Sequence, residues 1–157
     1  GKVNLIASDH APHTSAEKLG ANVDFLSAPP GIPGVETTLP LMYTYLVSKA
    51  GLPLTRLLNL MAFQPAYLFG ICNSQGYKKG QITVGGDADL TLFDPKANYK
   101  IRGDALHGKS TYTPFENWKV SGKVCRTILR GITIYQEDEL IDTKTSTNRG
   151  RFLPRQP

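Results

Sequence analysis

Three ionisable side chains stand close together near the start of the sequence, in the run Asp9-His10-Ala11-Pro12-His13. A carboxylate in such a cluster can ligate a hard or borderline cation and take a proton from metal-bound water. Pro12 fixes one backbone φ, which holds His13 in a definite direction relative to Asp9. The same spacing also fits a polar turn, in which Asp9 accepts backbone N–H bonds and both histidines are solvated. Spacing alone therefore leaves metal chemistry and a polar turn both open.

The residues on either side of this cluster indicate how it is positioned. Residues 2–7 are a short apolar run, which is typical of a buried parallel strand with functional groups at its C-terminal end. Residues 14–34 are rich in Gly, Pro, Ser and Asn and include the run Ala28-Pro29-Pro30-Gly31-Ile32-Pro33-Gly34. Loops of this length inside a compact domain are usually lids or binding loops. The sequence predicts a strand that places Asp9 beside a long loop.

Helices are predicted after this loop. A broad apolar face indicates a first helix, capped by Thr37 or Thr38, with Pro40 in its first turn and its end at Gly51. A second helix is predicted from residue 54 to a break at Gln64-Pro65, and Pro65 starts a short third helix.

The second half of the chain alternates apolar and polar residues with a period of two, which predicts strands separated by Gly-Gly, Asp-Pro and Arg-Gly breaks. The alternating sets are Ile82/Val84, Leu90/Leu92, Val124/Arg126/Ile128 and Ile132/Ile134. Residues 102–118 are predicted to form a long connection. Helices followed by strands suggest two structural units, 1–75 and 76–142, and residues 143–157 form a tail.

Composition and charge limit the class of protein. A chain of 157 residues with 40% hydrophobic residues can bury one sizeable core. Its uncharged stretches are shorter than the ~20 apolar residues of a membrane span, so a soluble protein is predicted. Cys72 and Cys125 form no Cys-x-x-Cys pair, which excludes a thiolate zinc finger or disulfide framework and favours a reducing, cytoplasmic compartment.

The net charge of +5 does not indicate a nucleic-acid partner. Four of the basic residues fall in the tail 143–157, which contains no acidic residue. Because no basic stripe is interleaved with aromatic residues, the tail is interpreted as a solubilising or docking extension.

Two runs near the start of the chain are the most specific: Ala7-Ser8-Asp9-His10-Ala11-Pro12-His13-Thr14, and residues 28–37 with their Pro-Pro-Gly sequence. They resemble the end of the catalytic barrel of a dihydroorotase of the amidohydrolase superfamily. Later stretches are similar to the β-sandwich that follows this barrel: Lys79-Gly80-Gln81-Ile82, Gly85-Gly86-Asp87-Ala88-Asp89-Leu90, Thr113-Pro114-Phe115-Glu116 and Lys119-Val120-Ser121-Gly122. Hydantoinases, dihydropyrimidinases and allantoinases share these later motifs, which therefore identify only the branch of the superfamily.

The resemblance implies a role for individual residues. Asp9 would bind metal and carry the proton of the bridging hydroxide, and His13 would bind the carboxylate of dihydroorotate. The backbone around Pro30 and Gly31 would meet the pyrimidine ring. The cofactor would be one or two zinc ions, with most ligands outside this chain. His10 is expected to have a supporting or structural role, and His107 is expected to be solvated.

The resemblance also implies the fold: an α/β fragment with the last strand and final helices of a (β/α)₈ TIM-type barrel, followed by part of a β-sandwich domain. A complete barrel needs about 200 residues or more. The family's His-x-His strand, its carboxylated lysine or aspartate and its two further histidine strands do not occur in the chain. We therefore expect a C-terminal fragment that is inactive alone, with apolar edges at 82–84 and 89–93 that need covering.

The implied activity is the metal-dependent, reversible cyclisation of N-carbamoyl-L-aspartate to dihydroorotate in pyrimidine biosynthesis. In hydrolysis, a metal-activated hydroxide would attack the ring amide carbonyl, and Asp9 would pass the proton to the departing nitrogen. A hydantoinase or dihydropyrimidinase is one alternative, but its substrates lack the ring carboxylate that His13 would hold. A catalytically silent, dihydroorotase-like subunit that scaffolds a partner such as aspartate transcarbamoylase is another. The expected partners are the small-molecule substrates and the missing N-terminal barrel portion, with no nucleic acid and no membrane.

Overall fold

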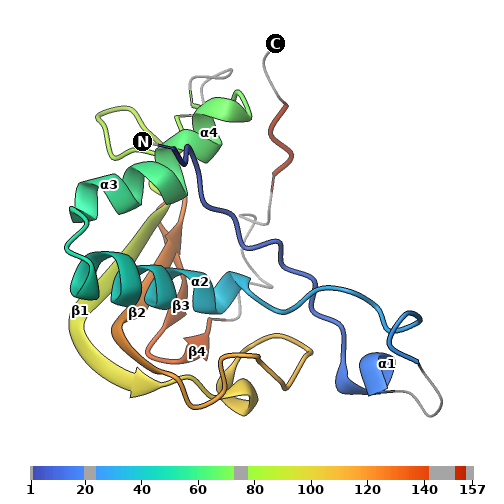
Figure 1. The fold of residues 1–157 in the computed structure, drawn as a ribbon. Helices are drawn as coiled ribbons and strands as arrows, with labels where there is room; N and C mark the ends of the chain where they lie inside the picture. The colour runs from blue at the N-terminus through green and yellow to red at the C-terminus, as the bar shows by residue number, and fades with distance from the viewer. Residues whose placement is uncertain (1, 20–23, 73–77, 142–150, 155–157) are drawn as a thin grey trace.

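A layer of helices covers one face of a four-stranded antiparallel sheet in the computed structural model, and helix α1 lies apart from both (Figure 1). The structure describes residues 2–19, 24–72, 78–141 and 151–154. The elements in chain order are α1 (Ser15–Leu19), α2 (Val35–Met42), the π-helix η1 (Tyr43–Lys49), α3 (Leu54–Leu58), the π-helix η2 (Asn59–Phe63), α4 (Gln64–Leu68), β1 (Leu90–Lys100), the 3₁₀-helix η3 (Gly103–Ala105), β2 (Lys119–Leu129), β3 (Ile132–Gln136) and β4 (Glu139–Leu140). Among the described helices, none has the length and apolarity needed to span a bilayer.

The strand predicted at residues 2–7 does not form. This segment has no regular structure, residues 2–4 are exposed, and Ile6 N donates to Leu60 O at 3.0 Å on the helical layer. A parallel strand needs neighbouring strands to pair with. No described strand runs beside residues 2–7, so the prediction of a strand is wrong for the chain by itself.

The first predicted helix is present but begins earlier than expected, at Val35, with Gly34 at the N-cap position. The Thr38 hydroxyl, 2.6 Å from Gly34 O, donates back to this carbonyl and does not cap the helix. Instead, His10 Nδ1 accepts the N–H groups of Gly34 and Val35. The cap therefore comes from a distant segment, which a local pattern cannot reveal. The helix continues through η1 to Lys49, and Gly51 follows with φ +74°, as predicted.

The second predicted helix is not broken at Pro65. Gln64 keeps helical dihedrals (φ −62°, ψ −43°), so α3, η2 and α4 form one continuous helical run. Pro65, the second residue of α4, therefore lies inside a helical run that continues without its N–H. The run ends at Gly70, which has φ +68°. Gly70 N donates to Tyr67 O and Ile71 N to Ala66 O, the bonding pattern of a Schellman cap.

The sheet confirms most of the predicted strands. Its order is β1-β2-β3-β4, and β1 pairs with β2 from Leu90↔Ile128 to Lys100↔Lys119. The connection 102–118 contains the short helix η3 and no strand, as expected. The strand expected at Ile82 and Val84 does not form, and these side chains are 90% and 98% exposed. Gly86 N donates to Thr83 O at 2.9 Å, so the Gly-Gly pair closes a turn at this point.

The helical layer and the sheet share a small core. Leu41 of α2 packs with Ile101 and Val120, and all three are buried. Buried Thr44 of η1 accepts a hydrogen bond from Ser121 N at 2.9 Å, which ties the helical layer to β2. The boundary between units 1–75 and 76–142 stays a prediction, and most of the predicted tail 143–157 lies outside the described residues.

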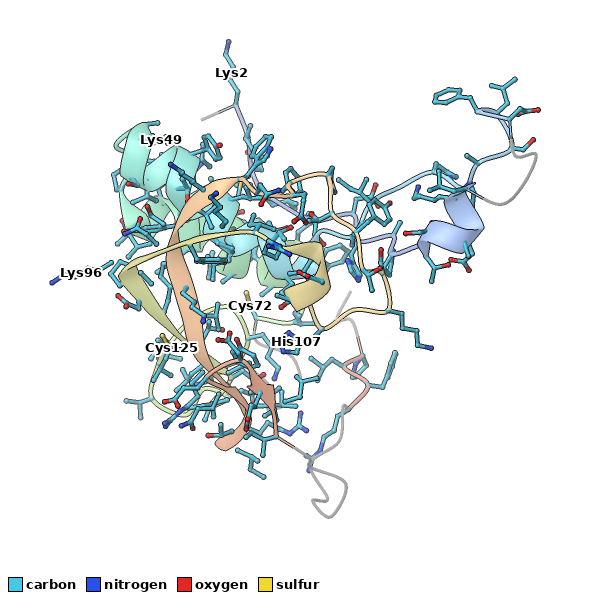
Figure 2. All side chains as sticks on the ribbon, turned by 90° about the horizontal axis from the view of Figure 1, so that it is seen from below. Lys2, Lys49, Cys72, Lys96, His107 and Cys125 are labelled. Carbon is cyan, nitrogen blue, oxygen red and sulfur yellow. The ribbon has the colours of Figure 1, made fainter. Side chains whose placement is uncertain are left out.

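Both cysteines are free thiols, in agreement with the sequence (Figure 2). Cys72 is buried, and its burial raises the pKa of the thiol. Cys125 is half-buried in β2.

Candidate functional site

The structure places the Asp9–His13 segment beside the Pro-Pro-Gly loop. His10 and Ile32 form an isolated parallel bridge, and Ala11 N donates to Ile32 O at 3.0 Å. His10 Nδ1 accepts hydrogen bonds from Gly34 N at 3.0 Å and Val35 N at 3.2 Å. His10 therefore joins the two most specific motifs of the sequence and has the structural role expected of it.

Asp9 lies at the surface with a left-handed backbone. Its φ is +45°, a conformation that Asp adopts more readily than most residues. Ile6 N is bonded before it and Ala11 N after it, so the backbone on both sides is fixed. Among the described residues, none donates a hydrogen bond to the Asp9 carboxylate. The carboxylate is thus open to a ligand.

His13 stands two residues before the first residue of helix α1 and close to Glu17. His13 Nδ1 lies 3.8 Å from Glu17 Oε2, and the His13 side chain is 36% exposed. Thr14 N donates to Glu17 Oε2 at 2.6 Å and Glu17 N to Thr14 Oγ1 at 3.3 Å, which is a capping box at the start of α1. The backbone N–H of Thr14 lowers the pKa of the Glu17 carboxyl. Glu17 is thus an ionised partner within ion-pair distance of the His13 ring.

Glu17 was not predicted as a member of the site, although the Thr14-x-x-Glu17 spacing is the standard capping-box signal. The composition of residues 14–34 predicts a loop, so the sequence does not indicate that a helix follows this capping-box spacing.

Gly31 allows the loop to approach the Asp9–His13 segment closely. It has φ +101°, and a Cβ at this position would collide with the Cβ of Ala11. Pro30 next to it is exposed, and Lys18 Nζ donates to Pro29 O at 2.7 Å. Pro30 and Gly31 thus lie alongside the segment that carries Asp9 and His13.

His107 is an exposed residue, but its side chain is held by hydrogen bonds and is not simply hydrated. Its Nδ1 lies 2.8 Å from Glu36 Oε1, its backbone N donates to Glu36 Oε2 at 3.0 Å, and its Nε2 lies 3.2 Å from Asp138 O. The Glu36 carboxylate raises the pKa of the imidazole. Glu36 was not predicted as its partner, because the two residues are joined only by tertiary packing.

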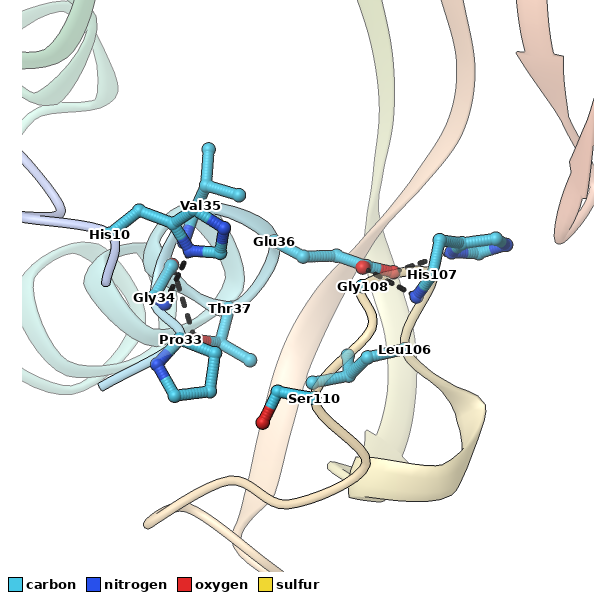
Figure 3. Close-up of a pocket in the computed structure, with 10 residues that line it drawn as sticks. All are labelled: His10, Pro33, Gly34, Val35, Glu36, Thr37, Leu106, His107, Gly108 and Ser110. Atoms are coloured by element: carbon cyan, nitrogen blue, oxygen red, sulfur yellow. Dashed lines mark hydrogen bonds and ion pairs between the residues drawn. The ribbon is translucent and has the colours of Figure 1, made fainter. Parts of the chain in front are cut away.

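A shallow pocket of ≈ 250 Å³ lies between His10 and His107 (Figure 3). Residues 33–37 at the start of α2 form one side, and Leu106, His107, Gly108 and Ser110 form the other. The pocket is therefore bordered by the two histidines that anchor the α2 N-terminus.

The described residues do not form a metal site by themselves. No group of three His, Cys, Asp or Glu side chains in the described part of the chain is placed to hold a metal ion. Asp9 can offer one carboxylate, which is fewer than the three protein ligands of a catalytic zinc site.

The described fold packs helices on one face of an antiparallel sheet, and its polar residues lie at the junction of two loop segments. Comparison with known proteins places the chain in a family. The amidohydrolase family matches residues 3–134. The chain therefore belongs to the amidohydrolase family, whose members are generally metal-dependent.

Relatives and solved structures agree with this assignment. The chain is 41% identical to the dihydroorotase of Pyrococcus furiosus over 140 residues, covering 89% of the chain and 30% of that protein. It is 38% identical to the dihydroorotase of Methanothermobacter thermautotrophicus, covering 98% of the chain and 32% of that protein. The D-hydantoinase (dihydropyrimidinase) of a Thermus species superposes with a TM-score of 0.81 at 30% identity, covering 91% of the chain and 30% of that structure. The chain thus spans about a third of the length of its relatives.

Proposed function

We propose that the complete protein is a dihydroorotase, which interconverts N-carbamoyl-L-aspartate and dihydroorotate. The observation that carries this proposal is the placement of the Asp9–His13 segment against the Pro-Pro-Gly loop through His10, Ala11 and Ile32. These two motifs are the part of the sequence most specific for dihydroorotases, and the dihydroorotase relatives give it further support.

Each residue has a role in this proposal. Asp9, an open carboxylate, binds metal and moves the proton between the attacking oxygen and the departing ring nitrogen. His13, with the ionised Glu17 beside it, binds the carboxylate of dihydroorotate by donating a hydrogen bond from its ring. Pro30 and Gly31 present backbone to the pyrimidine ring, and the missing side chain of Gly31 lets this loop lie against Ala11.

The metal is proposed to be zinc, as one or two ions. Asp9 is the only ligand assigned to it in this chain, and one carboxylate does not make a zinc site. The remaining ligands belong to the part of the relatives' length that this chain does not match.

The proposal includes the architecture of the complete protein. Residues 2–7 become the last strand of a TIM-type barrel once neighbouring strands are present, and residues 1–75 form the end of that barrel. Residues 76–142 form part of a β-sandwich and residues 143–157 a basic tail. The two free thiols support a cytoplasmic location.

A hydantoinase or dihydropyrimidinase is the second candidate. It is favoured by the structural similarity to the Thermus enzyme and to the L-hydantoinase of Arthrobacter aurescens. The Arthrobacter structure superposes with a TM-score of 0.77 at 34% identity, covering 88% of the chain and 30% of that structure. A silent subunit that scaffolds a partner such as aspartate transcarbamoylase remains the third.

The proposal is tested by comparing kcat/KM of the zinc-loaded complete protein for dihydroorotate, dihydrouracil and hydantoin. We expect dihydroorotate to be preferred by about 10²-fold or more, because the other rings leave His13 without a carboxylate to bind. Preference for dihydrouracil or hydantoin would favour the second candidate. Turnover of none of the three would favour the silent subunit.

A further inference from the structure

Both ring nitrogens of His107 have a hydrogen-bond partner. Glu36, in the first turn of α2, accepts at Nδ1, and the carbonyl of Asp138, between β3 and β4, accepts at Nε2. The Tyr135 ring packs edge-on against the imidazole, with ring centroids 5.5 Å apart. The His107 side chain is only 27% exposed, so these contacts lie in a partly desolvated site.

Both partners of the ring accept hydrogen bonds. A backbone carbonyl is always an acceptor, and an ionised carboxylate is only an acceptor. A neutral imidazole has one N–H and can satisfy one of them, whereas the imidazolium has two N–H groups and satisfies both. The geometry therefore selects the cationic form of His107.

The groups around His107 come from four elements. Glu36 lies on α2 and Tyr135 on β3, while Asp138 is held by Lys123 of β2 and by the Tyr135 hydroxyl. Tyr99 of β1 stands in the same electrostatic neighbourhood. Burial, together with the charges of Glu36 and Asp138, raises the pKa of Tyr99 to about 12, so this phenol stays neutral. The Glu36 carboxylate is hydrogen-bonded to the His107 ring, and the Asp138 carboxylate is a second negative charge that raises the pKa of the imidazole.

Glu36 is connected to the proposed active site through the start of α2. The residues just before it, Gly34 and Val35, donate their N–H groups to His10, which is next to Asp9. The same stretch leads back through Ile32, bonded to Ala11, to Gly31 and Pro30. A shift of the α2 N-terminus would therefore move both segments of the site together.

We infer that His107 is a positioning residue: as an imidazolium it clamps Glu36, and hence the α2 N-terminus and the two site segments, to the sheet. This inference rests on the proposed function for its effect on turnover. The clamp itself depends only on the contacts of Glu36, His107 and Asp138. Amide hydrogen exchange measures it independently of turnover.

The structural test measures amide hydrogen exchange at Gly34 and Val35 in the complete protein. His107→Gln and Glu36→Gln each remove the ion pair, so exchange at both amides should rise by roughly tenfold, since local opening becomes easier. The matched control is Lys109→Gln, which removes a positive charge from the same exposed loop and should leave exchange unchanged. In the wild type at neutral pH, ¹⁵N NMR should show both His107 ring nitrogens protonated.

The kinetic test uses dihydroorotate with the same variants. A misplaced binding loop should lower kcat/KM by up to about 10²-fold, mostly through a higher KM. The double variant His107→Gln/Glu36→Gln should lose no more kcat/KM than the worse single variant, because both substitutions remove the same Glu36–His107 ion pair.

The outcomes separate the inference from the proposed function. If His107→Gln behaves like Lys109→Gln in exchange, or if only one ring nitrogen is protonated, the clamp is overturned even if dihydroorotate is turned over. If Glu36→Gln raises exchange but the wild type does not turn over dihydroorotate, the clamp stands and the proposed function fails. If His107→Gln does not fold, hydrogen exchange of Glu36→Gln and the ¹⁵N NMR measurement on the wild type still test whether the clamp exists.

Discussion

Asp9 combines an exposed carboxylate with a left-handed backbone that neighbouring hydrogen bonds hold in place. Because Asn adopts this conformation equally well, Asp9→Asn should leave folding intact. In the complete protein, however, we expect kcat to fall by at least about 10²–10⁴, the usual worth of one proton-transfer group. The measurement is kcat with dihydroorotate alongside the thermal midpoint. A variant that folds and keeps kcat within about tenfold would show that Asp9 is only a polar turn residue.

His107 makes stability depend on pH in a direction fixed by its contacts. The Glu36 hydrogen bond raises its folded-state pKa above the ordinary value of 6.5, so the folded state binds the proton more tightly than the unfolded state. This stabilisation is fully present below pH 6.5 and is lost as the pH rises through the raised pKa. The Tm difference between wild type and His107→Gln should therefore shrink from about pH 6 to about pH 9. A difference that is constant or grows with pH would contradict this.

At the residue scale, the Asp9–His13 cluster and its neighbouring loop could be identified from the sequence, because the chemistry there is contiguous in the chain. Their mutual contact through His10 agrees with the expected structural role of that histidine. The Glu36–His107 pair could not be predicted, since 71 residues separate its members and neither stands in a local motif.

At the scale of elements, packing of the helical layer on the sheet depends on Gly122 of β2. Gly122 has φ +88°, and a Cβ there would collide with Phe93 and lie 2.8 Å from Tyr43 Cδ1. Gly122→Ala should therefore cost about 1–3 kcal/mol of overpacking in addition to about 1–2 kcal/mol of backbone strain. Urea unfolding of the complete protein measures the loss.

The control for this prediction is Gly131→Ala in the β2–β3 turn. Gly131 has φ +83° with no atom within 4 Å of a built Cβ, so the substitution introduces strain without a collision. Equal losses at the two positions would mean that the helical layer does not press on β2 as described.

The elements predicted well from the sequence are those with internal periodicity. Alternation at Leu90/Leu92 and Ile132/Ile134 coincides with β1 and β3, and the apolar helical face ends at Gly51 as expected. The failures depend on context. The apolar run 2–7 needs strands to pair with, the start of α2 takes its cap from His10, and the alternation at Ile82 and Val84 is cut short by a turn.

At the scale of the molecule, many large apolar side chains remain uncovered. Ile82, Val84, Tyr67 and Phe69 are exposed, and β1 pairs with only one described strand. The expected apolar surface at 82–84 is thus present, and Leu92 of β1 is 42% exposed. Surfaces of this kind usually mark an interface, which agrees with a chain that covers about a third of its relatives.

The same incompleteness predicts how the 157 residues behave alone. Because the described residues contain no three-ligand cluster, the isolated chain should not retain stoichiometric zinc through gel filtration and should not turn over dihydroorotate. Zinc content by mass spectrometry and a dihydroorotate assay check this. Retained zinc at one equivalent would mean that the chain holds a site from residues outside those described.

The central claim is that this region binds an anionic ring through His13, and the most direct measurement compares His13→Ala with wild type in the complete protein. Losing a charge-assisted hydrogen bond to a buried carboxylate should lower kcat/KM for dihydroorotate by about 10- to 150-fold. Turnover of dihydrouracil, which lacks the carboxylate, should scarcely change, so the substrate preference should collapse. Equal proportional losses for both compounds would contradict the account and assign His13 to loop or metal support instead.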